Sequence, residues 1–114
     1  MRAELTRLDV KEIVYSGGTL AGKNLYKLDL SDIDLSMVDL RFCDLRYANL
    51  KGANLTGANL QRANLGGADL SKASLSHADF SWADMRWVCF RDATSIAAIY
   101  RNCVLLESVF FDAI

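Results

Sequence analysis

Leucine recurs at every fifth position through most of the chain, and the residue two positions before it is small and apolar. Asp or Asn nearly always stands between the two, as in Ala53-Asn54-Leu55. The repeating unit is therefore Ala-(Asp/Asn)-Leu-x-x, in which x is variable. The core that this pattern predicts consists of the fifth positions Leu25, Leu30, Leu35, Leu40, Leu45, Leu50, Leu55, Leu60, Leu65, Leu70, Leu75, Phe80, Met85 and Phe90.

A period of five residues fits neither regular secondary structure. On an α-helix five residues rotate the side chain by about 140°, so the leucines would be spread around the whole surface. On a straight strand successive leucines would point to opposite faces, because five is odd. The pattern fits a short extended piece, in which Ala and Leu face the same way, followed by a corner of two residues. The sequence therefore predicts a chain that coils around a core of leucines.

The residue between Ala and Leu indicates how many pentads complete one turn. With four pentads per turn, residues twenty apart stack, and one such column is Asn24, Asp44, Asn64 and Asp84. In this arrangement no column brings two carboxylates together, whereas five pentads per turn would place Asp44 over Asp69. Carboxylates about 4.8 Å apart would repel each other by roughly 1 to 3 kcal/mol. The alternation of Asp and Asn therefore favours a four-sided coil.

The Ala-(Asp/Asn)-Leu-x-x unit, which runs cleanly from residue 18 to 93, resembles the pentapeptide-repeat family. This resemblance implies an all-β fold, a right-handed quadrilateral β-helix with about twenty residues per coil and about four to five coils. The repeat is specific for the fold and nearly silent on function, because function depends on sites carried by the fold.

We expect two regions along the chain. Residues 1–17 form an N-terminal capping segment, and residues 18–114 form the β-helix, with a degenerate pattern after about residue 93. In the first coil larger side chains replace the small inner residue, which indicates that this end is wider or covered. These replacements are Leu28, Ile33, Val38 and Cys43.

A short helix is predicted from Thr6 to Ser16. Asp9 with Glu12 resembles a capping box, and Gly17 with the following glycine is suited to ending the helix. Its apolar residues Val10, Ile13 and Val14 share one face, so we expect the helix to cover the first coil.

The last coil is apolar on its outside as well as its inside. An exposed apolar surface at the end of a solenoid favours aggregation unless it is buried. We therefore predict a homodimer through this coil, with self-capping by the tail as the alternative; self-association through this end is also known in some family members. The expected interface consists of Val104, Leu106, Val109, Phe111 and Ile114.

Composition argues against several classes of function. The formal net charge of -1 gives the whole chain no electrostatic footprint for nucleic acid or an anionic membrane. The three cysteines show no metal-ligand spacing and too few partners for a disulfide framework. No signal peptide or membrane span is evident, so a cytoplasmic location is expected. His77 is the sole histidine and lies at a corner, where a solvated side chain is favoured over a general base. We therefore expect no enzyme activity. We also expect no metal or other cofactor.

One group of corner residues is not explained by the repeat. The four-sided register stacks Phe42, Arg62 and Trp82 on one corner and Tyr47, Gly67 and Trp87 on the next. Exposed aromatic residues and arginines are enriched in binding hot spots, although aromatics can also stack on one another along the coils. The glycine corner is expected to leave a notch. The candidate partner patch consists of Arg41, Phe42, Arg46, Tyr47, Arg62, Trp82, Arg86 and Trp87.

Three functions compete. The first is a non-catalytic protein-interaction scaffold that presents this patch on a rigid β-helix. The second follows from the resemblance alone: one branch of the family binds DNA gyrase with an acidic rod that imitates DNA. The near-neutral charge, the arginines and a rod of roughly 22 Å argue against it. The third, binding of nucleic acid or carbohydrate through the patch, would be distinguished from the second by its salt dependence. We favour a protein partner over nucleic acid.

Overall fold

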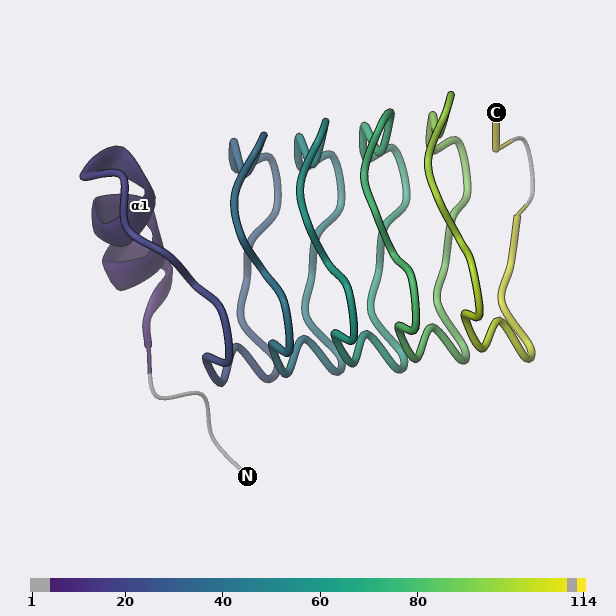
Figure 1. The fold of residues 1–114 in the computed structure, drawn as a ribbon, viewed down its shortest axis with the longest axis horizontal. Helices are drawn as coiled ribbons and strands as arrows, with labels where there is room; N and C mark the ends of the chain where they lie inside the picture. Colours follow the sequence, from purple (N-terminus) through teal and green to yellow (C-terminus); the bar gives the residue numbers. More distant parts are fainter. Residues whose placement is uncertain (1–4, 111–112) are drawn as a thin grey trace.

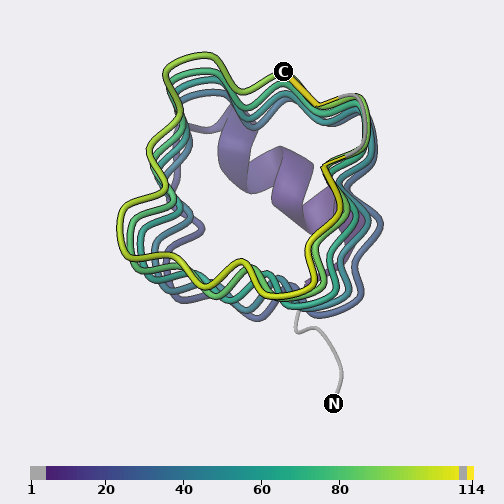
Figure 2. The same ribbon diagram turned by 90° about the vertical axis from the view of Figure 1, so that its right-hand side faces the viewer.

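The chain coils into stacked four-sided turns in a computed structural model, which describes residues 5–110 and 113–114. Isolated parallel β-bridges join residues twenty apart, from Asn24↔Asp44 to Cys89↔Val109, so four pentads complete one coil. Figure 1 shows the coils side by side along one axis, and Figure 2 shows their square outline. Among the described residues each side contributes single bridge residues rather than a continuous strand, so the β-structure is sparser than an all-β fold would suggest.

Backbone hydrogen bonds between neighbouring coils repeat with the same offset. The Leu30 N–H donates to the Asn49 carbonyl at 2.7 Å and the Asp32 N–H donates to the Lys51 carbonyl at 2.9 Å. In the other direction the Asn49 N–H donates to the Leu28 carbonyl at 2.9 Å. Each coil is therefore joined to the next by a parallel ladder, which pairs the polar backbone groups that surround an apolar core.

The corners explain why Asp or Asn precedes each leucine. The side chain accepts a hydrogen bond from the backbone N–H two residues later, as in Asn54 with Thr56 at 3.0 Å and Asp69 with Ser71 at 2.9 Å. This local bond favours a turn, and Asp and Asn form it readily. The second residue of each corner has positive φ, for example 58° at Tyr47.

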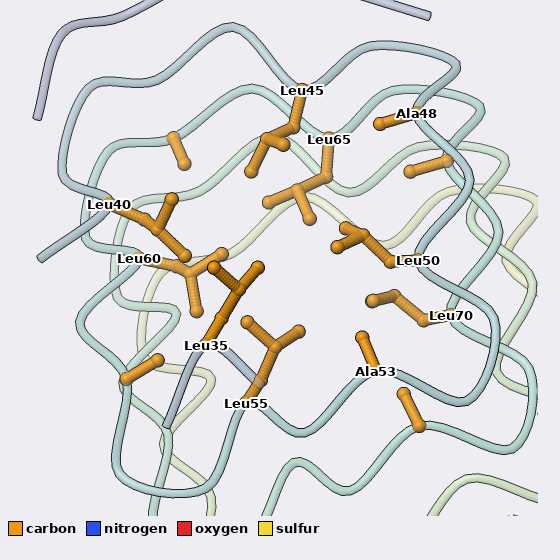
Figure 3. Packing of buried hydrophobic residues seen from close by; sticks show 14 of the residues in the cluster. Leu35, Leu40, Leu45, Ala48, Leu50, Ala53, Leu55, Leu60, Leu65 and Leu70 are labelled. Carbon is orange, nitrogen blue, oxygen red and sulfur yellow. The ribbon is translucent and has the colours of Figure 1, made fainter. Parts of the chain in front are cut away.

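The core consists of the residues at the fifth positions. All fourteen predicted core side chains are buried with relative exposures of at most 1%, and the alanines two positions before them are buried too. In Figure 3, Leu45 and Leu65 point inward one above the other, as do Leu50 and Leu70 from the next side. Stacking such residues lengthens the core along one axis, so each coil is stabilised by its neighbours.

Helix α1 spans Arg7–Tyr15 and crosses the open end of the first coil (Figures 1 and 2). The predicted helix is confirmed, but its capping box is different. Thr6 is the N-cap, its side chain accepts from the Asp9 N–H, and the Asp9 carboxylate accepts from the Thr6 N–H. The Asp9 and Glu12 pairing was wrong because the cap lies one turn earlier.

Helix α1 packs on the first coil and is joined to it by a tight turn. Val10 is fully buried against the first coil. After the helix, the Gly18 N–H donates to the Ile13 carbonyl at 2.8 Å and the Gly17 N–H donates to the Val14 carbonyl at 3.0 Å. This Schellman arrangement, with φ of 80° at Gly17, turns the chain into the first pentad.

The backbone repeat continues where the sequence repeat blurs after about residue 93. The turn and bridge pattern extends without interruption to Phe110. Stacked aromatic rings replace leucines inside these last coils, with 5.3 Å between the Phe80 and Tyr100 centroids and 4.5 Å between those of Phe90 and Phe110. Backbone pairing and aromatic stacking thus preserve the coil although the Ala and Leu positions have changed. In the described part of the chain no helix has the length and apolar character that crossing a membrane requires.

Candidate interaction surface

One side of the solenoid carries most of the predicted partner patch. Its centre is the outward column Asn24, Asp44, Asn64 and Asp84, which parallel bridges hold in register. The corner before this column carries Phe42, Arg62 and Trp82, each two residues before a member of the column. The corner after it carries Arg46 and Arg86, which are followed directly by Tyr47 and Trp87. We call this surface the arginine–aromatic face; it comprises residues 22–27, 42–47, 62–67 and 82–87.

Four aromatic side chains of this face are largely exposed. Phe42 and Tyr47 are 62% and 56% exposed, and Trp82 and Trp87 are each 54% exposed. All four have positive φ at the second corner position. A residue other than Gly at positive φ needs support from its surroundings, and here the ladder of backbone bonds supplies it. The rings are therefore displayed from a rigid backbone.

Guanidinium groups lie over the two tryptophan rings. Arg62 lies over the Trp82 ring, 5.2 Å from its centroid, and Arg86 lies 5.3 Å from the Trp87 centroid. Cation–π contacts of this kind contribute about 0.5–1 kcal/mol at exposed sites. They orient the tryptophans and keep apolar ring area at the surface.

Three of the four arginines in the predicted patch are paired with an Asp two residues earlier. Arg41 contacts Asp39 at 2.8 Å, Arg46 contacts Asp44 at 2.7 Å, and Arg86 contacts Asp84 at 2.7 Å. In each pair a second hydrogen bond comes from Nε, as from Arg86 to Asp84 Oδ1 at 2.9 Å. The signal for these pairs is in the sequence: Asp-x-Arg places both side chains at one corner.

These pairs shift the titration of the carboxylates. The hydrogen bonds from Arg46 lower the pKa of the Asp44 carboxyl, and those from Arg86 lower the pKa of the Asp84 carboxyl. Burial opposes the shift in both cases, but the hydrogen bonds favour the charged form more strongly. At neutral pH the pairs are therefore ionised and neutral overall.

Tyr26 belongs to this face although the sequence reasoning did not include it. The Arg46 guanidinium lies 5.1 Å from the Tyr26 centroid, and Tyr26 meets Tyr47 edge to face at 6.0 Å. The signal was available, because Tyr26 stands twenty residues before Arg46 in the same corner column.

The notch expected at the glycine corner is not present at Gly67. A Cβ atom at Gly67 would lie 2.5 Å from Cε1 of Tyr47, so the tyrosine ring already covers this position. The Tyr47 side chain leans toward the following coil, and Gly67 accommodates its ring. The prediction was wrong because it treated the corner side chains as pointing straight outward.

The remaining candidate groups are the histidine and the cysteines. His77 is exposed at a corner with φ of 61°. Burial raises the pKa of the Cys43 thiol to about 11 and also raises the pKa of the Cys103 thiol. Within residues 5–110 and 113–114, no three His, Cys, Asp or Glu side chains gather where they could hold a metal ion.

Two open grooves of about 640 and 360 Å³ flank helix α1. The larger is lined by Lys11, Glu12, Val14, Tyr15, Ile33 and Asp34. Neither groove contains a residue of the arginine–aromatic face.

The predicted dimer residues lie on the last described coil. Val104 and Val109 are each 47% exposed, Leu106 is 61% exposed and Ile114 is 73% exposed. Phe111 lies outside the described residues. Val104 continues the column of Asp84, and Leu106 continues the corner column of Arg86, so both adjoin the arginine–aromatic face.

The family model for pentapeptide repeats matches residues 24–62 and 53–92, with eight copies of the repeat. The chain belongs to the pentapeptide-repeat family. The predicted resemblance is therefore confirmed, and it carries with it the right-handed β-helix of the family. No curated protein matches the sequence significantly.

Solved structures of other pentapeptide-repeat proteins resemble this one. A protein of the Arabidopsis thaliana thylakoid lumen is 37% identical over 79% of this chain and 59% of its own, with a TM-score of 0.64. Rfr23 from the cyanobacterium Cyanothece 51142 is 33% identical over 75% of this chain and 56% of its own, with a TM-score of 0.57. The chain thus spans less than two thirds of the length of either relative. QnrB1, a plasmid-mediated fluoroquinolone resistance protein, is 21% identical with a TM-score of 0.43, which carries no inference about function.

Proposed function

We propose that this pentapeptide-repeat protein is a non-catalytic scaffold that binds another protein through the arginine–aromatic face. The observation that carries the proposal is the exposure of Trp82 and Trp87, 54% each, at adjacent corners of one coil. Large aromatic residues lose little conformational entropy on binding and are enriched in interface hot spots together with arginine.

The alternative reading is that the aromatics merely stack on one another along the solenoid. Among the described residues of this face, the ring–ring contact within stacking distance is that of Tyr26 with Tyr47. The tryptophans instead rest against arginines, and about half of each side chain is exposed to solvent. Solubility alone would not favour several exposed aromatic rings on one side of a small protein.

Site-specific photo-crosslinking in the native host tests the proposal. A photoreactive phenylalanine analogue replaces Trp87 in one variant and His77 in a control, because His77 occupies the equivalent corner position on another side. We expect a defined protein adduct from position 87 and none of the same mass from position 77. Equal adducts from both positions, or none from position 87, would refute the proposed surface.

We also propose that the chain forms a homodimer through its last coil. The support is the exposed apolar group Val104, Leu106, Val109 and Ile114, which occupies columns that are mostly polar in the earlier coils. The double substitution Val104→Asn and Leu106→Arg restores the residue types of those columns, represented by Asn64 and Arg86. We expect light scattering to give a dimer mass for the natural protein and a monomer mass for the folded variant. A monomeric natural protein would exclude this interface.

A further inference from the structure

The arginine–aromatic face carries an excess of positive charge although the whole chain has a formal net charge of -1. Its four segments contain five cationic residues and two carboxylates, an excess of three positive charges. The carboxylates are Asp44 and Asp84, and each is already bound by an arginine of its own coil. The excess is carried by Lys23, Lys27 and Arg62.

Arg62 differs from the other arginines of the patch. Among the described residues, no carboxylate lies within ion-pair distance of its guanidinium, whereas Arg41, Arg46 and Arg86 each have an Asp partner. The reason lies in the position of Arg62 within the pentad. It is the second corner residue, with φ of 62°, and its side chain extends over Trp82 of the next coil.

This arrangement prepares Arg62 to bind a carboxylate. A guanidinium that rests on an indole ring loses part of its conformational freedom, while its N–H groups remain able to donate to an acceptor. A carboxylate can accept two parallel hydrogen bonds from such a group, and this charge-assisted geometry is stronger than a neutral hydrogen bond. The neighbouring rings of Phe42 and Trp82, 62% and 54% exposed, offer apolar contacts on the same corner.

We infer that the partner of this face is an acidic and apolar protein segment, which places a carboxylate on Arg62 and apolar side chains on Phe42 and Trp82. The inference rests on the proposed function and specifies the chemistry of the partner. A nucleic acid is disfavoured, because the positive charge that Asp44 and Asp84 do not neutralise is limited to Lys23, Lys27 and Arg62, which is little for binding a row of phosphates. A protein segment can place its acidic groups at Arg62 alone.

Selection from a random 12-residue peptide library displayed on phage tests the inference on the full chain. The most enriched peptide is synthesised, together with a version in which every Asp and Glu is replaced by its amide. Binding is then measured by fluorescence polarisation to the natural protein and to Arg62→Gln, Trp82→Ala and Lys72→Gln. Lys72 is the matched control, because it is an exposed cation at the same corner position, with φ of 59°, on another side. Circular dichroism verifies that each variant is folded.

We expect the enriched peptides to combine Asp or Glu with aromatic or aliphatic residues. Arg62→Gln is expected to weaken binding of the acidic peptide by about tenfold or more, and Lys72→Gln to leave it unchanged. Replacing the acidic groups of the peptide by amides should weaken its binding to the natural protein by a similar factor. The same replacement should weaken binding to Arg62→Gln little further.

Two different failures are distinguishable. If the peptides require Trp82 but contain no acidic residue, or tolerate Arg62→Gln, the face binds protein and the inferred chemistry is wrong. If no selected peptide depends on Trp82, the proposed function itself fails. A twelve-nucleotide oligothymidine strand is included as a competitor at physiological salt. We expect the strand not to compete. If it instead binds more tightly than the peptide and requires both Arg62 and Trp82, the partner is a nucleic acid and not a protein.

Discussion

At the scale of single residues, each pentad position is selected by a different physical requirement. The leucine fills the core, the alanine fits the small buried space beside it, and the Asp or Asn accepts a hydrogen bond from the corner backbone. The second corner position must adopt positive φ, yet side chains as large as Trp82 and Trp87 occupy it. The energetic cost of this conformation is accepted where the side chain has another role, either packing on the next coil or facing a partner.

Gly67 provides a test of how corner side chains pack along the solenoid. Gly67→Ala introduces a Cβ that would lie 2.5 Å from the Tyr47 ring, in addition to the cost of positive φ. We expect a loss of about 2 kcal/mol in the free energy of unfolding, measured by urea titration. The control is Gly22→Ala, which has the same φ of 73° but no atom within 4 Å of the new Cβ, and it should lose only about 1 kcal/mol. A second Tyr47→Ala substitution should recover part of the Gly67→Ala loss; equal losses for the two glycines would show that the ring does not matter.

The Asp–Arg pairs predict a dependence of stability on pH. The pKa of Asp84 is lowered in the folded chain by the hydrogen bonds from Arg86. A lowered folded pKa contributes stability above the unfolded value of about 3.9, and this contribution is lost as pH falls through the folded value. The melting temperature should therefore fall between pH 5 and pH 2, and less steeply in Arg86→Gln. The difference should stay below about 1 kcal/mol, because the Arg86 side chain is 44% exposed and the pair is partly solvated. An identical acid profile for both proteins would assign the pair no role in stability.

At the scale of elements, helix α1 replaces a missing coil. In the solenoid the carbonyls of Asn49 and Lys51 accept backbone N–H groups from the coil before them. The equivalent carbonyls of the first coil belong to Asp29 and Ser31, and Arg7 donates to both, at 2.9 and 2.8 Å. One guanidinium thus supplies two donors where a preceding coil would supply two backbone N–H groups. The sequence could not reveal this contact, because its acceptors are backbone atoms.

Removing this guanidinium should loosen the first coil selectively. We expect Arg7→Met to lower the free energy of unfolding by about 1 kcal/mol, because two charge-assisted hydrogen bonds to carbonyls at a half-exposed site are lost. Hydrogen exchange should accelerate at amides of α1 and the first coil, with little change beyond the third coil. Lys11→Met on the same helix is the matched control and should leave the exchange pattern unchanged. A uniform acceleration along the whole chain would contradict a local cap.

The sequence predicted the fold more completely than the surface, for a physical reason. The core positions and the stacking of residues twenty apart follow from a strict period, so Leu45 over Leu65 and Asp44 beside Asn64 could be inferred without coordinates. The surface follows from side-chain directions that the period does not determine. Tyr47 covers Gly67 instead of leaving a notch, Arg46 lies over the Tyr26 ring, and Arg62 lies over Trp82. Each of these depends on how a side chain leaves its corner.

At the scale of the whole molecule, the pentad rather than the coil is the unit that the core requires. Every pentad presents its Ala and Leu inward and then turns, so removal of one pentad should shift the sides without exposing the core. Deletion of residues 56–60 joins Leu55 to Gln61 and keeps all later leucines inward. It does bring Asp44 over Asp69, and it removes one buried leucine that contributes roughly 1.5 to 3 kcal/mol. We therefore expect a folded but less stable protein.

Deletion of four residues, 57–60, gives the contrasting outcome. Each later residue then moves to the pentad position that follows its own, so Asn64, Asp69 and Asp79 would replace leucines inside the core. Burying unpaired carboxylates costs several kcal/mol for each group, which is more than a domain of this size can sustain. We expect circular dichroism and urea titration to show a cooperative unfolding transition for the five-residue deletion and none for the four-residue deletion. If both deletions fold equally well, the inward leucines do not determine the register of the solenoid; if neither folds, the coil of twenty residues, rather than the pentad, is the indivisible unit.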